Sequence, residues 1–244
     1  MDDSELKIGA VSAPVRLQVV QTLRKAILQG RFAPGARLVE KDLCELMGVS
    51  RVSIREAFRQ LESEGIIENV PNRGPVVAKL NREQVKDVYE ARQALEALAA
   101  KLFASNASEK QVEDLEKATE TLASAYRSGD VDKIIAAKDI FYGILYSGCG
   151  NEVAPEMLTI LNTRITLLRR VSLSVPGRSK KSLREMRRLM AAIRKRDGAA
   201  AWLAASAHVQ KASEAALAQI DLLAAKAISA PPPYRGPVDD PDVE

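Results

Sequence analysis

The sequence predicts a mainly α fold, with an N-terminal helix-turn-helix domain that carries a small two-stranded wing and a C-terminal all-α antiparallel helical bundle. Three observations lead to this prediction. Apolar residues recur at helical spacing along most of the 244 residues. Two short runs rich in β-branched residues interrupt that pattern, at residues 66–70 and 75–78. Hydrophobic residues make up 46% of the chain but aromatic residues only 4%, which favours helices packed through Leu, Ala, Ile and Val.

Changes in composition divide the chain into two domains and two tails. Residues 14–79 form the first predicted domain and residues 80–228 the second. This agrees with the usual size of about 150 residues per domain. Residues 1–13 are expected to be a flexible N-terminal tail. Residues 229–244 are acidic and rich in proline, a composition typical of disorder, so a disordered tail is expected there.

The first domain begins with three predicted helices. Apolar residues spaced along 15–29 predict the first helix, which Gly30 ends. Pro34 and Gly35 then turn the chain into a second helix at residues 38–47. Gly48 can take the positive φ that a tight turn requires. Ser50 is a natural N-cap for the third helix, which Glu64 and Gly65 end.

The second and third helices have one apolar and one polar face. The apolar residues are Leu43, Leu46, Val49, Ile54, Ala57 and Leu61. The polar face of the third helix carries Arg51, Ser53, Arg55 and Arg59. A helix-turn-helix presents its recognition helix to the DNA major groove in this way. A helical hairpin with merely solvated arginines would show the same pattern, because look-alikes of this motif are common.

A predicted hairpin after the third helix favours the DNA-binding alternative. Strands are expected at residues 66–70 and 75–78, with the turn-forming residues Pro71-Asn72-Arg73-Gly74 between them. Together with the three helices they predict a winged helix-turn-helix. Residues 14–79 contain 11 Lys and Arg and 7 Asp and Glu, a modest surplus. The positions of the arginines therefore carry the argument, and two copies acting together are expected on DNA.

Several of these motifs resemble one family. They are Gly30, Pro34-Gly35, Leu38, Gly48-Val49-Ser50-Arg51, Arg55-Glu56-Ala57 and Asn72-Arg73-Gly74. Residues 23–77 resemble the DNA-binding domain of GntR-superfamily bacterial transcription regulators, with Cys44 where the family usually has alanine. The resemblance implies a homodimer on a palindromic operator in double-stranded DNA. The residues expected at the DNA are Lys41, Arg51, Ser53, Arg55, Arg59, Asn72, Arg73 and Gly74.

The second domain is predicted to contain six helices with short links. Asn81, Ser108 and Ser182 each precede Gln or Glu by three residues, a pattern typical of a capped helix start. The last helix is expected at about residues 198–227. Helices of this length with short connections form an antiparallel bundle.

The bundle sequence resembles the FCD effector domain of the FadR subfamily over about residues 84–224. The matching residues are Tyr89-Glu90-Ala91-Arg92, Leu95-Glu96, Ala99-Ala100, Phe141, Gly148, Gly150-Asn151, Ala192-Ile193, Arg196-Asp197 and His208. The resemblance implies an effector-binding and dimerisation domain.

One departure from the FCD pattern concerns its metal. Most FCD domains hold a divalent metal through one Asp and three His. The corresponding positions here are Lys138, Tyr142, Met186 and His208, and His208 is the only histidine in the chain. A lysine, a phenol, a thioether and one imidazole are not a ligand set for Zn, Mn or Ni. Using Asp139 instead leaves one carboxylate and one imidazole. We therefore predict no metal and no other cofactor.

The pocket itself can persist without the metal. Lys138 would place an ammonium where the family holds a metal cation, and the resemblance turns Arg92 toward the same cavity. Arg164 and Arg169 are further candidates. Together with Tyr142, Met186 and His208 these residues predict a site for a small anionic metabolite. In the alternative, Lys138 extends to the surface and the other side chains fill the former cavity.

A basic run extends from Arg178 to Arg196, where nine basic residues accompany a single acid, Glu185. Such runs are usually solvated helix faces. Contact with flanking DNA, or with an acidic face of a partner subunit, is the alternative.

The function predicted from these features is a ligand-responsive transcription regulator, a repressor acting as a cytoplasmic homodimer. A regulator that has lost effector response is the alternative within this class. The sequence lacks the Ser/His/Asp, Cys/His and phosphate-loop patterns of enzymes, which argues against catalysis. An architectural DNA-bending protein is disfavoured by the two-domain plan.

No apolar run approaches the roughly 20 residues of a membrane span. The two cysteines, Cys44 and Cys149, lie in different domains and favour free thiols.

Overall fold

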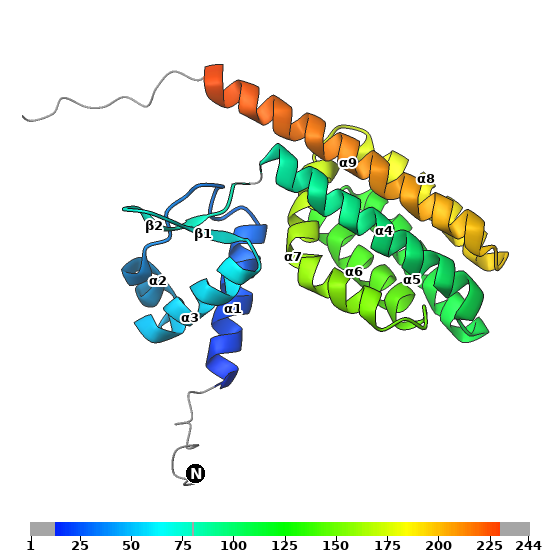
Figure 1. Cartoon of the computed structure of the whole chain (residues 1–244), viewed down its shortest axis with the longest axis horizontal. Helices are drawn as coiled ribbons and strands as arrows, with labels where there is room; N and C mark the ends of the chain where they lie inside the picture. The colour runs from blue at the N-terminus through cyan, green and yellow to red at the C-terminus, as the bar shows by residue number, and fades with distance from the viewer. Residues whose placement is uncertain (1–12, 80, 230–244) are drawn as a thin grey trace, which may run out of the picture.

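The computed structural model describes residues 13–79 and 81–229, which form an N-terminal head and a larger helical bundle (Figure 1). Both expected tails, apart from Ala13 and Ser229, lie outside the described residues. The mainly α architecture predicted from the sequence is confirmed. No helix within the described part of the chain combines the length and apolar character needed to cross a membrane.

The head is a winged helix-turn-helix. Its elements are α1 (Ala13–Leu28), α2 (Glu40–Met47), α3 (Arg51–Ser63), β1 (Ile67–Val70) and β2 (Gly74–Val77). Its core is apolar, with α1 and α3 packed together through residues that include Leu23, Ile27, Ile54 and Leu61. The two strands pair antiparallel. Burial of this shared core fixes α3 against α1, so that the other face of α3 is free for a ligand.

The predicted turn and cap between α2 and α3 are confirmed. Gly48 adopts φ +65° in the left-handed region, where a side chain would be strained. The Ser50 side chain accepts a hydrogen bond from the Ser53 backbone N–H and so caps α3. One apolar residue was placed wrongly: Leu46 is 55% exposed rather than buried. The short helix α2 buries only Leu43 fully, which leaves Leu46 at the rim of a shallow groove against α1.

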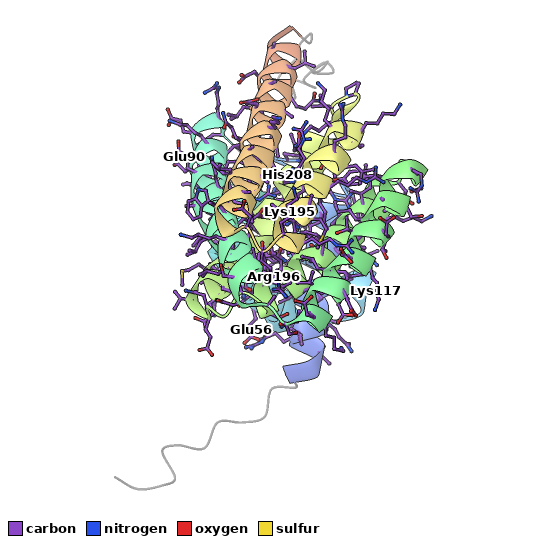
Figure 2. The ribbon with its side chains drawn as sticks, turned by 90° about the vertical axis from the view of Figure 1, so that its right-hand side faces the viewer. Glu56, Glu90, Lys117, Lys195, Arg196 and His208 are labelled. Atoms are coloured by element: carbon purple, nitrogen blue, oxygen red, sulfur yellow. The ribbon has the colours of Figure 1, made fainter. Side chains whose placement is uncertain are left out.

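Six helices form the described part of the second domain, as predicted. They are α4 (Arg82–Asn106), α5 (Glu109–Ser128), α6 (Val131–Ser147), α7 (Val153–Leu173), α8 (Arg178–Arg194) and α9 (Gly198–Ser229). The long helices α4 and α9 lie side by side. Charged side chains such as Glu90 and Lys117 lie on the outside of the bundle, whereas His208 lies among the helices (Figure 2).

Two of the three expected caps are present. Asn81 and Ser108 both form capping boxes with the residue three positions later. The predicted cap at Ser182 is wrong, because α8 already begins at Arg178. Ser182 is buried inside the helix, where its hydroxyl hydrogen-bonds the hydroxyl of Tyr126.

The head is attached to the bundle by a polar contact between the end of α3 and the middle of α7. The Arg164 Nε donates to the backbone oxygen of Glu64 at 3.0 Å, and the Thr163 hydroxyl donates to its carboxylate at 3.2 Å. The same carboxylate accepts from Arg24 Nε at 3.0 Å. Gly65 lies under Arg164, and a Cβ built there would be 2.1 Å from Arg164 Nη2. We refer to these residues as the head–bundle contact.

Candidate DNA-binding surface and buried cationic cavity

The recognition helix α3 presents its arginines to solvent. Arg51, Arg55 and Arg59 are all exposed on one side of the helix, opposite its packing against α1. The Arg55 Nε donates to both Glu40 oxygens at 3.0 Å, although 61% of the Arg55 side chain remains exposed. Ser53 is half-buried, and its hydroxyl lies 3.0 Å from that of Ser50. The arginines can therefore reach an incoming ligand, and Arg55 would exchange Glu40 for it.

A second group of basic residues lies beside the start of α3. Arg37, Lys41 and Arg51 border a groove of about 300 Å³ that Pro75 of the wing closes on one side. Lys41 makes only a loose pair with Glu45, at 4.0 Å between Nζ and Oε1. Arg37 was missed by the sequence reasoning, because it precedes α2 in an irregular segment. Its position next to the wing follows from antiparallel backbone pairing, an isolated β-bridge, between Arg37 and Val76.

The tip of the wing is exposed and tightly turned. Asn72 and Gly74 adopt φ +62° and +78°, conformations that suit Asn and Gly in tight turns. Arg73 at the tip donates from Nη2 to the Gly35 backbone oxygen at 3.1 Å. The wing residues expected at the DNA therefore lie on the same side of the head as the Pro34–Gly35 turn.

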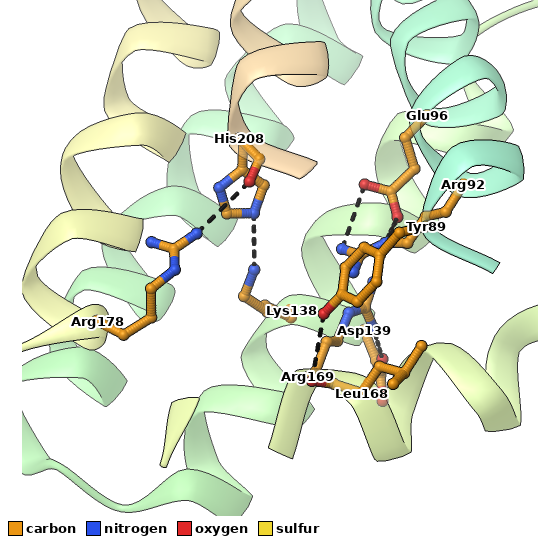
Figure 3. A network of polar contacts seen from close by, with 9 residues as sticks. All are labelled: Tyr89, Arg92, Glu96, Lys138, Asp139, Leu168, Arg169, Arg178 and His208. Carbon is orange, nitrogen blue, oxygen red and sulfur yellow. Dashed lines mark hydrogen bonds and ion pairs between the residues drawn. The ribbon is translucent and has the colours of Figure 1, made fainter. Parts of the chain in front are cut away.

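A second site lies inside the bundle, where buried cations from four helices converge (Figure 3). Arg92 of α4, Lys138 of α6, Arg169 of α7 and Arg178 of α8 are 0–5% exposed. They line a cavity of about 10 Å³ together with His208 of α9. We call this the cationic cavity. Burial of so many like charges is costly unless partners compensate them.

Carboxylates compensate only part of this charge. Glu96 accepts from Arg92 Nε at 2.6 Å, and Glu185 accepts from Arg178 Nη2 at 2.8 Å. Arg169 Nη1 donates to Asp139, whose side chain is half-exposed, at 3.0 Å. Although burial opposes its ionisation, Arg92 and Arg169 hold the pKa of Glu96 below its ordinary value. Three guanidinium groups and the Lys138 amine thus face two buried carboxylates.

Lys138 and His208 form the centre of the cavity. The Lys138 Nζ lies 3.2 Å from His208 Nε2, and His208 Nδ1 lies 2.7 Å from Glu185 Oε2. The tautomer with its proton on Nδ1 satisfies both contacts, since Nε2 then accepts from the amine. Burial, followed by the charge of Arg169, holds the pKa of Lys138 well below its ordinary value. Burial and Lys138 likewise lower the pKa of His208.

Several donors in the cavity have no partner. Within the described residues, Arg92 Nη1, Arg169 Nε, and both Nε and Nη1 of Arg178 are buried and make no hydrogen bond. Buried polar groups without partners are rare in native structures, and each calls for an explanation such as a bound ion or water. The cavity therefore has the donors and the charge to hold an anion.

The structure brings most of the predicted effector residues together. Arg92, Lys138, Arg169 and His208 line the cavity, and the ring of Tyr142 lies 4.6 Å from the Arg169 Cζ and 5.8 Å from the Lys138 Nζ. The alternative in which Lys138 extends to the surface is wrong, since its side chain is buried.

Two predicted effector residues lie elsewhere. The expectation that Arg164 faces the cavity is wrong, because it contacts the head. It lies five residues from Arg169 on one helix, about 140° around the axis, so the two cannot face the same way. The expectation for Met186 is also wrong, because it packs in the apolar core of the bundle.

The sequence did not predict that Arg178, Glu185 and Glu96 lie at the cavity. Glu96 carried a usable signal, because it follows Arg92 by four residues and so lies on the same face of α4.

The residues of the cationic cavity do not suit the divalent metal that the resemblance to FCD domains implies. At the four positions that correspond to metal ligands, the chain offers one imidazole, whose two nitrogens contact Lys138 and Glu185. Within the described residues, no group of three or more His, Cys, Asp and Glu side chains has an arrangement that suits a metal ion. The three guanidinium groups around the cavity would also repel a divalent cation.

Comparisons with known proteins agree with the fold and identify its family. The FCD domain matches residues 87–211, and the family described as bacterial regulatory proteins, gntR family, matches residues 15–77. The chain is 32% identical to the uncharacterised HTH-type transcriptional regulator YdhC of Bacillus subtilis strain 168, over 85% of this chain and 92% of YdhC. It is 31% identical to the HTH-type transcriptional repressor RspR of Escherichia coli K12, over 82% and 88% of the two chains.

A solved structure shows the same arrangement. E. coli McbR/YncC aligns with a TM-score of 0.69 at 24% identity, covering 89% of this chain and 100% of that chain. The two family matches, with the relatives YdhC and RspR, identify a DNA-binding transcription regulator. The chain belongs to the GntR family, with an FCD domain as its second domain.

Proposed function

We propose that this regulator is a repressor that binds a palindromic operator as a homodimer, and that a small anionic metabolite in the cationic cavity sets its affinity for DNA. The observation that carries the proposal is the set of buried, unpartnered guanidinium donors around Lys138. A carboxylate or phosphate would supply the missing acceptors through charge-assisted hydrogen bonds. Repression is supported by RspR, a relative named as a transcriptional repressor.

The ligand would act on the protonation of Lys138. An anion beside the amine favours its charged form, so binding would raise the lowered pKa of Lys138 and recruit a proton. Arg92 and Arg169 would donate from the nitrogens that now lack partners. His208 would accept from Lys138 while Glu185 holds its ring in place.

Ligand entry would require the helices to separate. The cavity of about 10 Å³ holds no more than about one water molecule, so even a small carboxylate needs more space. Helix α7 carries Arg169 in the cavity and Thr163 and Arg164 in the head–bundle contact. Movement of α7 would therefore reach the end of the recognition helix and alter the spacing of two heads in a dimer.

The small cavity also favours a second candidate, a regulator of this family that has lost its effector response. Both candidates share the DNA-binding head and differ only in whether the cavity opens. A thermal-shift screen of small carboxylates and phosphates separates them, because a bound ligand stabilises the folded state. The first candidate predicts a stabilising anion for the wild type and none for Lys138→Met. The absence of any such anion supports the second.

DNA binding has its own test. Full-length protein would be used to select a duplex from a random library, and its affinity would be measured by fluorescence anisotropy. A bidentate arginine–guanine contact contributes about 1–3 kcal/mol, so Arg51→Ala or Arg55→Ala should weaken binding at least several-fold. Arg127→Ala, which changes an exposed arginine on α5, is the control and should leave affinity unchanged. Unchanged affinity in both head variants would remove α3 from the interface.

A further inference from the structure

The outer face of the bundle has a second basic feature, which shares Arg178 with the cationic cavity. A groove of about 560 Å³ lies between α8 and α9, a volume within the usual range for small-molecule sites. We call it the outer groove. Its cationic lining residues are Arg178, Lys181, Arg184, Arg188 and Lys211. Only two carboxylates, Glu185 and Glu214, line it as well.

These cations have little internal compensation. Among the described residues, Lys181, Arg184, Arg188 and Lys211 form no ion pair with any carboxylate. The Glu185 carboxylate is already engaged by Arg178 and His208. The groove is therefore strongly positive, and its low-dielectric walls strengthen the potential inside it.

Arg178 distinguishes this groove from an ordinary solvated helix face. Its side chain is 5% exposed, and it lines both the outer groove and the cationic cavity. Its Nε and Nη1 have no partner within the described residues. The groove also borders the start of α8, which has no acidic residue in its first turn and no side-chain cap at Gly177. A helix start attracts anions through its dipole, although the Arg178 N–H itself is bonded to the Val175 oxygen at 3.1 Å.

From these features we propose that the outer groove binds a phosphorylated metabolite with at least two negative charges. Guanidinium groups recognise phosphate through paired N–H donors, and several arginines and lysines here surround one concave space. A concave groove with a buried guanidinium floor fits a small anion better than the open surface of a DNA duplex. This site does not rest on the effector proposed for the cationic cavity.

Inorganic pyrophosphate is a suitable probe, titrated into the full-length protein by calorimetry at constant ionic strength. Wild-type protein is expected to bind it saturably. Arg184→Ala combined with Arg188→Ala should weaken binding by about tenfold or more, because two charge-assisted contacts are lost. Both side chains are exposed, so the fold should persist, which circular dichroism checks.

Arg187→Ala is the matched control. Arg187 is an exposed arginine of the same helix, but it borders a different groove that also contains Glu113, Glu116 and Glu120. The control and Lys138→Met should both retain wild-type affinity for pyrophosphate.

Five results would overturn the proposal. Two concern specificity: no saturable binding to the wild type, and equal affinity for succinate, a dianion without phosphate. Two concern location: an equal loss in Arg187→Ala, and a loss in Lys138→Met that assigns the probe to the cationic cavity. The fifth is displacement of pyrophosphate by a random duplex that the double variant binds less tightly, which would assign the groove to DNA.

Discussion

Replacement of Lys138 by methionine should make the protein more stable while removing its response to an anion. Methionine keeps the length of the aliphatic side chain but has no amine. In the folded protein the amine has one close partner, His208 Nε2 at 3.2 Å, and three guanidinium groups share the same cavity. The substitution therefore removes a buried polar group that like charges surround.

The expected magnitude follows from two opposing contributions. Loss of the hydrogen bond to His208 costs about 1 kcal/mol. Removal of a buried polar group that is incompletely compensated stabilises by about 1–3 kcal/mol. The net gain should be about 0–2 kcal/mol, which corresponds to a rise in Tm of up to about 8 °C for a chain of this size.

The stability advantage of Lys138→Met over the wild type should depend on pH. The folded-state pKa of Lys138 lies well below its ordinary value, whereas in the unfolded chain it should be near 10.4. Between those values the unfolded state binds more protons, so the stability of the wild type rises with pH. The advantage of Lys138→Met should therefore be larger at pH 7 than at pH 9. His208 does not titrate in this range, because its own pKa is lowered.

Thermal and urea denaturation at both pH values provide the assay. Lys133→Met is the control, because Lys133 lies on the same helix with 69% of its side chain exposed. It should change stability by no more than about 0.5 kcal/mol. A Lys138→Met protein that is less stable than the wild type by a pH-independent amount would refute the reasoning, since Lys138 would then make net favourable contacts.

Three further substitutions test the links between elements. Thr163→Val removes the hydroxyl that donates to Glu64 and should reduce the effect of an anion on DNA affinity several-fold, measured by anisotropy, with little change in affinity without the anion. Gly65→Ala forces a side chain into φ +69° and against Arg164, so denaturation should show a loss of about 1–3 kcal/mol. Asn81→Ala removes the capping box of α4 and should cost about 0.5–2 kcal/mol in the same assay. Wild-type values in these assays would contradict the corresponding contact.

The head could be predicted closely from sequence because its signals are local. Gly48 and Ser50 each determine a turn or a cap through their own backbone and side-chain chemistry. Residues that depend on tertiary contacts were harder to place. Leu46 has helical spacing but lies near the end of a helix too short to bury it. Arg37 reaches the groove beside Arg51 only through its backbone pairing with Val76.

In the cationic cavity, too, some residues could be predicted from the sequence and others could not. Residues of known helical phase, such as Lys138 and Arg92, were placed correctly on the inner faces of α6 and α4. On α8, alignment to the FCD ligand positions placed Met186 at the cavity. Glu185 rather than Met186 meets His208, since neighbouring helix positions point about 100° apart. No local pattern reveals which of two adjacent residues faces a cavity.

Control of DNA affinity through the cationic cavity is the central claim, and one titration tests it most directly. The selected duplex would be titrated with wild-type and Lys138→Met protein, with and without the anion that gives the largest thermal shift. The account predicts equal affinities of the two proteins without the anion, and a several-fold change on its addition for the wild type only. An equal change in both proteins, or no change in either, would contradict it.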